Sequence, residues 1–413
     1  LSSNGAASQF VFLYPPSHTS TMPFCDNGLA TISPKECCIM SVFAPASPFA
    51  DFIYRHFRAI HALKLGLALL IAVIINAIWS PPHFIWSMVT IVIIMMSLPQ
   101  VGGAIEKSLQ RAVGTCLGSA YGVMLVATID SYWLIMGLLI LGVTLICFIS
   151  AGRYSYAYLV AGFTIIIVVG DANHDTSEAL WRTANILLGC VIAILVSLFI
   201  FPIKAKQDWR SQLANAINSM AKVLTQHLQA PANHDLDFRA DLEAAMKAVL
   251  TQKKLFFSLE WESQTLKKHK VLLAELVNKQ VRLITLLELL PLSRWQEADK
   301  EAYHQINRVA AELTAYLHRL SEFIAGKTAT LPTLPNALEQ ELQHRLQLTL
   351  ATPAPDHTSI SVANEVAQGF ALTGYGWLIY QLAIAVEALY ADIEIIEIAY
   401  SGQTVLHKTA KPS

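Results

Sequence analysis

The stretch Arg111-Ala-Val-Gly-Thr-Cys-Leu-Gly-Ser-Ala-Tyr-Gly122 places glycines at positions 114, 118 and 122 of an apolar run. Residues four apart lie on one face of a helix, so these glycines form a stripe that a neighbouring backbone can approach closely. A weaker copy follows 71 residues later, where Arg182 precedes small or polar residues at every fourth position: Asn185, Gly189, Ala193 and Ser197. The pattern predicts a packed membrane helix and a chain built from two related halves.

The composition is that of a membrane protein. Of 413 residues, 54% are hydrophobic and only 14% are charged, which is outside the usual range of soluble domains. The apolar residues concentrate between positions 59 and 201, and most charges lie between 204 and 330. A net charge of −1 argues against a strongly basic nucleic-acid binder, so we expect no nucleic-acid partner.

The N-terminal residues 1–50 mix Ser, Pro, Asn and Gly without the pattern of a signal peptide, and we expect a disordered tail. A translation start at Met40 is an open alternative. The six cysteines show no disulfide or zinc spacing. No Walker loop, nucleophile elbow or other catalytic motif occurs, so we expect neither enzymatic activity nor a cofactor or metal site.

Six apolar segments are predicted to cross a bilayer, which gives a transmembrane domain over residues 51–203. They are residues 59–79, 84–98, 112–129, 132–150, 154–170 and 184–202. Basic residues cluster at alternate ends of these segments, which places both termini in the cytoplasm. Arg182 is the exception, because it lies at the outer end of its segment whereas Arg111 lies at the inner end. We therefore expect a 3+3 inverted repeat, and Gly66 and Gly137 keep the same offset of 71.

Several short motifs occur in a characteristic order: Leu63-Lys64-Leu65-Gly66, then Trp86-Ser87-Met88-Val89-Thr90, Gly103-Ala104 and Lys107 in the next loop, and Arg111, Gly114, Thr115 and Gly118. Over residues 52–202 this order resembles the fusaric acid resistance family of bacterial inner-membrane proteins, which includes aromatic carboxylic acid exporters. It is also similar to the plant aluminium-activated malate transporters. The resemblance implies six spans, a cytoplasmic helical domain and passage of organic anions. Many members carry two such membrane units, so a single unit here implies a homodimer.

The candidate transport residues are cations, because a carboxylate substrate needs positive charge along its path and charge in a membrane segment is costly. We select Lys64, Lys107, Arg111 and Arg182, with Trp86 and Thr90 as further candidates along the path. The alternative is that Lys107 and Arg111 only set topology at the headgroups, and that Lys64 extends to the inner surface. Trp86 could equally belong to an interfacial aromatic belt.

The small residues are assigned to helix packing rather than to ligand binding. They are Gly66, Gly114, Thr115, Gly118, Gly122 and Gly189. For Thr90 and Thr115 we favour a hydrogen bond to a backbone carbonyl one turn back over a contact with substrate.

Residues 204–413 are predicted to form a cytoplasmic helical bundle, since apolar residues recur at helical spacing. The segment Val366–Val386 is uncharged and long enough for a seventh span, but its Gln and Gly residues favour a buried bundle helix. The lysine-rich runs at 253–254 and 267–270 are typical of solvated faces, with anionic lipid or substrate as the alternative ligands.

The leading functional hypothesis is a dimeric inner-membrane exporter of organic acid anions, in particular aromatic carboxylates, or of related toxic compounds. The alternatives are an anion channel gated by the bundle and a membrane-anchored assembly or regulatory protein. No Asp or Glu lies within the interior of a predicted span, so the buried carboxylate of a proton-coupled pump is missing. We therefore expect an electrogenic pathway; a periplasmic adaptor is a candidate partner.

Overall fold

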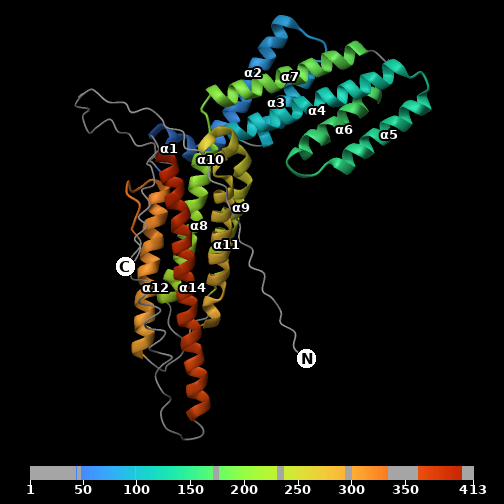
Figure 1. The fold of residues 1–413 in the computed structure, drawn as a ribbon. Helices are drawn as coiled ribbons and strands as arrows, with labels where there is room; N and C mark the ends of the chain where they lie inside the picture. Colours follow the sequence, from blue (N-terminus) through green and yellow to red (C-terminus); the bar gives the residue numbers. More distant parts are fainter. Residues whose placement is uncertain are drawn as a thin grey trace, which may run out of the picture. The chain divides into compact units, whose positions relative to one another are not determined.

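The computed structural model describes residue 43 and residues 48–97, 99–170, 176–229, 237–293, 300–333 and 361–401. All regular elements within these ranges are helices (Figure 1). The expected tail, residues 1–50 including Met40, lies almost entirely outside the described residues.

The apolar half of the chain forms seven α-helices and one short 3-10 helix within the described residues. They are α1 (Pro48–Arg55), α2 (Phe57–Trp79), α3 (Ile85–Ser97), α4 (Val101–Thr128), α5 (Tyr132–Ile149), η1 (Gly152–Tyr154), α6 (Ser155–Gly170) and α7 (Thr176–Phe199). Four segments are long and apolar enough to cross a membrane: α2, α5, η1 with α6, and α7. Helix α3 is apolar but has only 13 residues, and α4 contains many small or polar side chains.

Two helix starts differ from the sequence prediction. Helix α4 begins at Val101 rather than at residue 112, and α7 begins at Thr176 rather than at residue 184. Hydropathy detects the part of a helix that suits lipid, whereas backbone hydrogen bonding continues through polar turns. Gly103, Ala104 and Lys107, which were expected in a loop, therefore lie within α4.

Two hydrophobic clusters hold the apolar half together. One joins α2, α3 and α7 through buried side chains such as Ala68, Ile91 and Ala193. The other joins α4, α5 and α6 through Leu125, Ile135 and Ile165. Helix α5 contributes only Ile135 as a fully buried side chain. Most of its surface is therefore free to face lipid.

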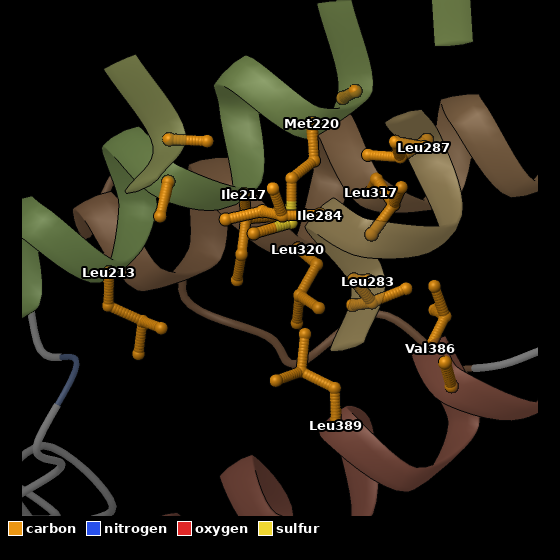
Figure 2. Close-up of a cluster of buried hydrophobic side chains, with 14 of the residues drawn as sticks. Leu213, Ile217, Met220, Leu283, Ile284, Leu287, Leu317, Leu320, Val386 and Leu389 are labelled. Atoms are coloured by element: carbon orange, nitrogen blue, oxygen red, sulfur yellow. The ribbon is translucent and has the colours of Figure 1, made fainter. Parts of the chain in front are cut away.

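The second half forms long helices around one core (Figure 2). They are α8 (Ala205–Gln229), α9 (Arg239–Glu262), α10 (Gln264–Lys268), α11 (Lys270–Glu288), η2 (Leu290–Ser293), α12 (Lys300–Ala325) and α14 (Ser361–Ser401). Helices α8, α11, α12 and α14 supply the side chains of Figure 2, among them Met220, Ile284, Leu317 and Leu389. The apolar stripes of these helices meet in the interior, which is the packing that an amphipathic pattern favours.

The segment Val366–Val386 lies within α14 and is not among the candidate membrane spans of the described residues. From Tyr375 onward its buried side chains, including Leu378 and Leu382, belong to the same core as α8 and α12. From Tyr375 to Val386, the packing is therefore that of a bundle helix.

Candidate functional site

Arg111 is the most deeply buried cation that α4 contributes, with 1% of its surface exposed. Its Nε donates a hydrogen bond to Thr90 Oγ1 of α3 at 3.1 Å, and one terminal nitrogen donates to the Tyr156 hydroxyl of α6 at 3.2 Å. The guanidinium also lies 5.9 Å from the centre of the Phe163 ring. Side chains from α3 and α6 thus hold the charge at a point where three helices meet.

None of the ion pairs within the described residues involves Arg111. Its neighbours are a hydroxyl, a phenol and an aromatic ring, which orient a guanidinium but do not neutralise it. A buried charge without a counter-ion is energetically costly, and this cost is reduced when an anion binds beside it. The site is therefore suited to a negatively charged ligand.

Lys107 lies one turn before Arg111 on α4 and is connected to it through Tyr156. Its Nζ lies 4.6 Å from the centre of the Tyr156 ring, while the hydroxyl of the same tyrosine accepts the hydrogen bond from Arg111. Lys107 is only partly buried. Along α4, the more exposed cation Lys107 is therefore followed one turn later by the buried cation Arg111.

Lys64 of α2 is fully buried, and its Nζ has no hydrogen-bond partner within the described part of the chain. Its side chain does not extend to the protein surface, as the alternative interpretation of Lys64 required. On the same face of α2, Ala68 and Ala72 belong to the cluster with α3 and α7. Lys64 is thus a second buried cation of the apolar half, after Arg111.

Arg182 of α7 lies with its guanidinium 5.6 Å from the centre of the Trp86 ring on α3. It also donates a hydrogen bond of 3.5 Å to the carbonyl oxygen of Ile167 on α6. Four of the predicted site residues therefore lie in two separate pairs: Arg111 with Thr90, and Arg182 with Trp86. Within the described residues, the Lys64 ammonium makes no hydrogen bond to either pair.

The glycines of α4 lie against α6. A β-carbon on Gly118 would be 2.6 Å from the Ala161 carbonyl oxygen and 2.9 Å from Thr164 Cβ, and one on Gly114 would collide with the Ala157 carbonyl oxygen. A β-carbon on Gly122 would be 2.8 Å from Val168 Cγ1. Glycine is thus required where α4 and α6 cross.

Gly189 of α7 makes the corresponding contact with α3. A β-carbon there would be 2.6 Å from the Ser87 carbonyl oxygen and 2.9 Å from Thr90 Cβ. Gly66 differs from the packing role expected for it, because its face of α2 is exposed and no described atom outside its own helix region lies within 4 Å. Within one chain, Gly66 is therefore not at a helix crossing.

The two threonines do not make the carbonyl bonds that the sequence favoured. The Thr90 hydroxyl accepts a hydrogen bond from Arg111 Nε. The buried Thr115 hydroxyl has no hydrogen-bond partner among the described residues. Since Thr90 fixes the orientation of Arg111, its role is to position the cation.

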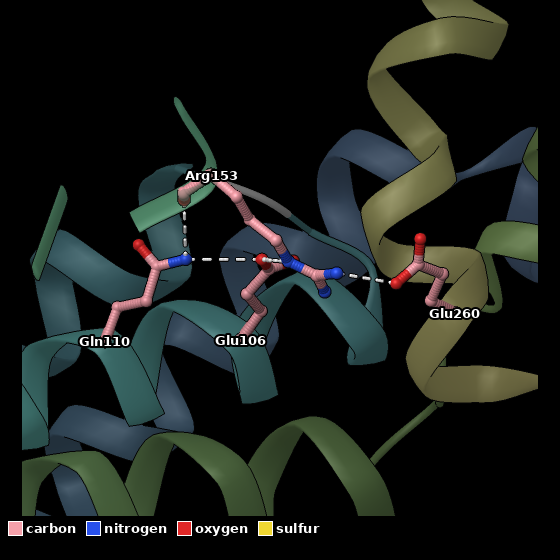
Figure 3. A network of polar contacts seen from close by, with 4 residues as sticks. All are labelled: Glu106, Gln110, Arg153 and Glu260. Atoms are coloured by element: carbon pink, nitrogen blue, oxygen red, sulfur yellow. Dashed lines mark hydrogen bonds and ion pairs between the residues drawn. The ribbon is translucent and has the colours of Figure 1, made fainter. Parts of the chain in front are cut away.

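A polar network joins the start of α4 and the α5–α6 connection to α9 (Figure 3). Arg153 of η1 pairs with Glu106 of α4 at 3.1 Å and with Glu260 of α9 at 2.6 Å. Gln110 donates to Glu106 and to the Arg153 carbonyl oxygen, both at 3.2 Å. The network connects α9 to the helix that carries Lys107 and Arg111.

Two backbone features strengthen this junction. Glu262 accepts a hydrogen bond from the Gly102 amide at 3.1 Å and another from the Lys206 amide at 3.4 Å. These amides lie at the starts of α4 and α8, where backbone donors have no helical partner and a carboxylate is favourable. Gly102 also lies so close to Ser258 of α9 that a β-carbon would collide with its carbonyl oxygen.

Sequence reasoning missed Tyr156, Phe163, Glu106 and Glu260. Glu106 and Gln110 follow Gly102 at helical spacing, which could have indicated that the helix starts before residue 112. No local pattern marks the partner of a buried arginine on another helix. Within the described residues, no group of His, Cys, Asp and Glu could hold a metal ion.

Comparison with known proteins places this arrangement in a family. Residues 58–386 match the fusaric acid resistance protein family. The chain belongs to this family. The match includes α2 to α7 and most of the bundle, and together with the four long apolar helices it supports a multi-pass location in the inner membrane.

Three relatives show how far the similarity extends. Inner membrane protein YeeA of Escherichia coli K12 is 31% identical over 206 residues, which is 50% of this chain and 57% of that protein. The uncharacterized transporter YdhK of the same strain is 25% identical over 279 residues, and the match covers 64% of this chain and 41% of that protein. Aluminum-activated malate transporter 2 of Arabidopsis thaliana is 27% identical over 188 residues, and the match covers 40% of this chain and 37% of that protein. The matched part thus spans about half the length, or less, of these relatives.

Proposed function

We propose that this family member is an inner-membrane transporter that exports organic anions, with aromatic carboxylates as the first substrate class to test. The observation that carries the proposal is the buried Arg111, which is oriented by Thr90 and Tyr156 and is paired with no described acidic residue. The relatives named as transporters favour this function over an enzymatic one.

The neighbours of Arg111 suggest a route for the anion. Lys107 would attract the carboxylate from the less buried end of α4, and Arg111 would receive it one turn further along the helix. The rings of Tyr156 and Phe163 provide flat apolar surfaces beside the two cations. A ligand that combines a carboxylate with an aromatic ring fits both features.

We propose that export is driven by the membrane potential. A potential of about 100 mV, negative inside, is worth roughly 2.3 kcal/mol per charge, which favours outward movement of a monovalent anion about 50-fold. The acidic residue closest to Arg111 in sequence, Glu106, is already paired with Arg153. This supports a pathway that does not depend on a carboxylate proton carrier.

We further propose that α3 and α4 complete a set of six spans arranged as an inverted repeat with cytoplasmic termini. A β-carbon on Gly118 would meet Ala161 and Thr164 of α6, and one on Gly189 would meet Ser87 and Thr90 of α3, at matching distances of 2.6 and 2.9 Å. In each proposed half, the third helix carries an arginine beside an aromatic ring of the other half: Phe163 for Arg111, and Trp86 for Arg182. Reciprocal contacts of this kind support the repeat.

The experiment is voltage-dependent efflux of an aromatic carboxylate from proteoliposomes that contain the purified protein. Substitution Arg111→Gln should lower the flux roughly tenfold or more, because it removes the buried charge while keeping a hydrogen-bonding side chain. The matched control is Arg239→Gln, which removes the same charge from an exposed position on α9. Equal flux in the two variants, at equal reconstitution, would refute the role of Arg111.

The second candidate is an anion channel gated by the bundle. It is favoured by the junction that joins α9 to α4 through Glu260, Arg153 and Glu106. Single-channel currents in a planar bilayer would select this candidate over a carrier. A membrane-anchored assembly protein, the third alternative, would show no anion flux in either assay. The proposed partners, a second copy of the chain and a periplasmic adaptor, would be detected by cross-linking in native membranes.

A further inference from the structure

An exposed group of aromatic and basic side chains lies at the end of α9 that contacts α4. We call it the basic-aromatic patch, and it consists of Phe257, Trp261, Lys267, Lys268, Lys270 and Val271. Phe257 and Trp261 are one turn apart on α9 and remain 45% and 44% exposed, and Val271 is 73% exposed. The three lysines are also exposed. Large aromatic side chains beside clustered lysines are unusual on a purely solvated face.

The contacts of α9 place this patch beside the membrane helices. Glu260 lies between Phe257 and Trp261 in the sequence and pairs with Arg153 at 2.6 Å. Arg153 belongs to the short connection between α5 and α6, which are long and apolar enough to cross a membrane. The Arg153 guanidinium lies 5.0 Å from the centre of the Phe257 ring. Phe257 therefore lies beside the connection between two apolar helices, and Trp261 follows it one turn along α9.

The charge of the patch is not balanced by the neighbouring acidic residues of α9. Glu260 forms an ion pair with Arg153, and the Glu262 carboxylate accepts hydrogen bonds from the backbone amides of Gly102 and Lys206. Both carboxylates are thus used within the protein. The next exposed acidic residue along α11 is Glu275, one turn beyond Val271. The outer surface of the patch is therefore positive.

We propose that the basic-aromatic patch binds the headgroups of anionic phospholipids in the leaflet that faces the bundle. Aromatic side chains favour the membrane interface, and clustered lysines are attracted to anionic lipids at its surface. The contact would hold α9 against the bilayer beside its junction with α4. This inference concerns the lipid contact of the bundle and does not depend on the identity of the transported anion.

The test is photo-crosslinking of the full-length protein in liposomes of phosphatidylcholine with radiolabelled phosphatidylglycerol. A benzophenone amino acid replaces Trp261 in one variant and Leu250 in the other. Leu250 is a matched control because it is also exposed on α9 but lies eleven residues earlier, about 16 Å further along the helix. The label should be captured at position 261 at least threefold more than at position 250.

A second comparison isolates the lysines. In the position 261 variant, the combined substitutions Lys267→Gln, Lys268→Gln and Lys270→Gln should lower capture of phosphatidylglycerol at least threefold. Capture of labelled phosphatidylcholine should not fall. Equal capture at positions 261 and 250, or capture of phosphatidylglycerol that is indifferent to the lysines, would overturn the proposal. So would a cross-link from position 261 to a second copy of the chain in place of lipid.

Discussion

Replacing Arg153 by glutamine should loosen the junction between α9 and α4. The change removes two ion pairs, at 3.1 Å to Glu106 and 2.6 Å to Glu260, whose carboxylate side chains are only 10% and 19% exposed. Exposed pairs contribute up to about 1 kcal/mol, and breaking a buried pair costs about 3–5 kcal/mol. Arg153 itself is 31% exposed, so solvent screens part of the loss. We expect a total cost of about 2–3 kcal/mol for opening the junction.

Hydrogen exchange of the protein in nanodiscs measures this cost locally. A loss of about 2–3 kcal/mol raises the opening equilibrium roughly 30- to 150-fold, so exchange of the Gly102 amide and of peptides covering 258–268 should accelerate by this factor. The control is Lys279→Gln, which breaks the 2.7 Å pair between α11 and α14 with a similar exposure of 24% and 6%. That variant should accelerate exchange near Asp392 but not at Gly102. An acceleration below about threefold in Arg153→Gln would show that the network does not hold the junction.

Three further outcomes follow from the contacts described. Gly118→Ala should destabilise the protein by about 1–3 kcal/mol, because the new β-carbon would lie 2.6 Å from the Ala161 carbonyl oxygen. The control Gly66→Ala should change thermal stability little, since no neighbouring atom among the described residues lies within 4 Å of its β-carbon position. Equal effects of the two changes in a melting assay would contradict the close crossing of α4 and α6. Gln252→Leu alone should cost about 1–3 kcal/mol since it leaves the buried Gln280 Oε1 without its hydrogen-bond donor, and adding Gln280→Leu should recover most of this loss in the same assay. Burial raises the pKa of Glu262 above its ordinary value of 4.5, so the folded state binds that proton more tightly than the unfolded state. This contribution to stability is present at low pH and is lost as the pH rises from about 4.5 through the folded pKa, and unfolding curves of Glu262→Gln should lack that part of the pH dependence.

The apolar helices were predictable because their composition differs sharply from that of the connections. Helix α2 was expected over 59–79 and is observed from Phe57 to Trp79. The start of α4 was not predictable in the same way, because its first turns contain two glycines and the charged residues Glu106 and Lys107, and they contact α9 and Arg153. Hydropathy therefore finds the lipid-facing part of a helix and misses its protein-facing extension.

The candidate site was only partly accessible from the sequence. A cation in an apolar run is visible in one dimension, so Lys64, Arg111 and Arg182 could be selected. Their environments depend on how helices cross, and no single-sequence pattern indicates that Tyr156 lies beside Arg111 or that Trp86 lies beside Arg182. Likewise, Gly66 and Gly118 occur in similar sequence settings, but only Gly118 lies where two helices of this chain meet.

The small buried fraction of α5 has a consequence for how the sequence can change over time. Only 6% of the most apolar stretch of α5 is buried inside the protein, whereas 44% of the corresponding stretch of α7 is buried. Most positions of α5 must satisfy a demand for hydrophobicity but not for shape, so Leu, Ile, Val and Phe can replace one another there at little cost. Related sequences should therefore diverge freely along α5 while keeping its character, and they should retain the small residues that line the contact between α4 and α6.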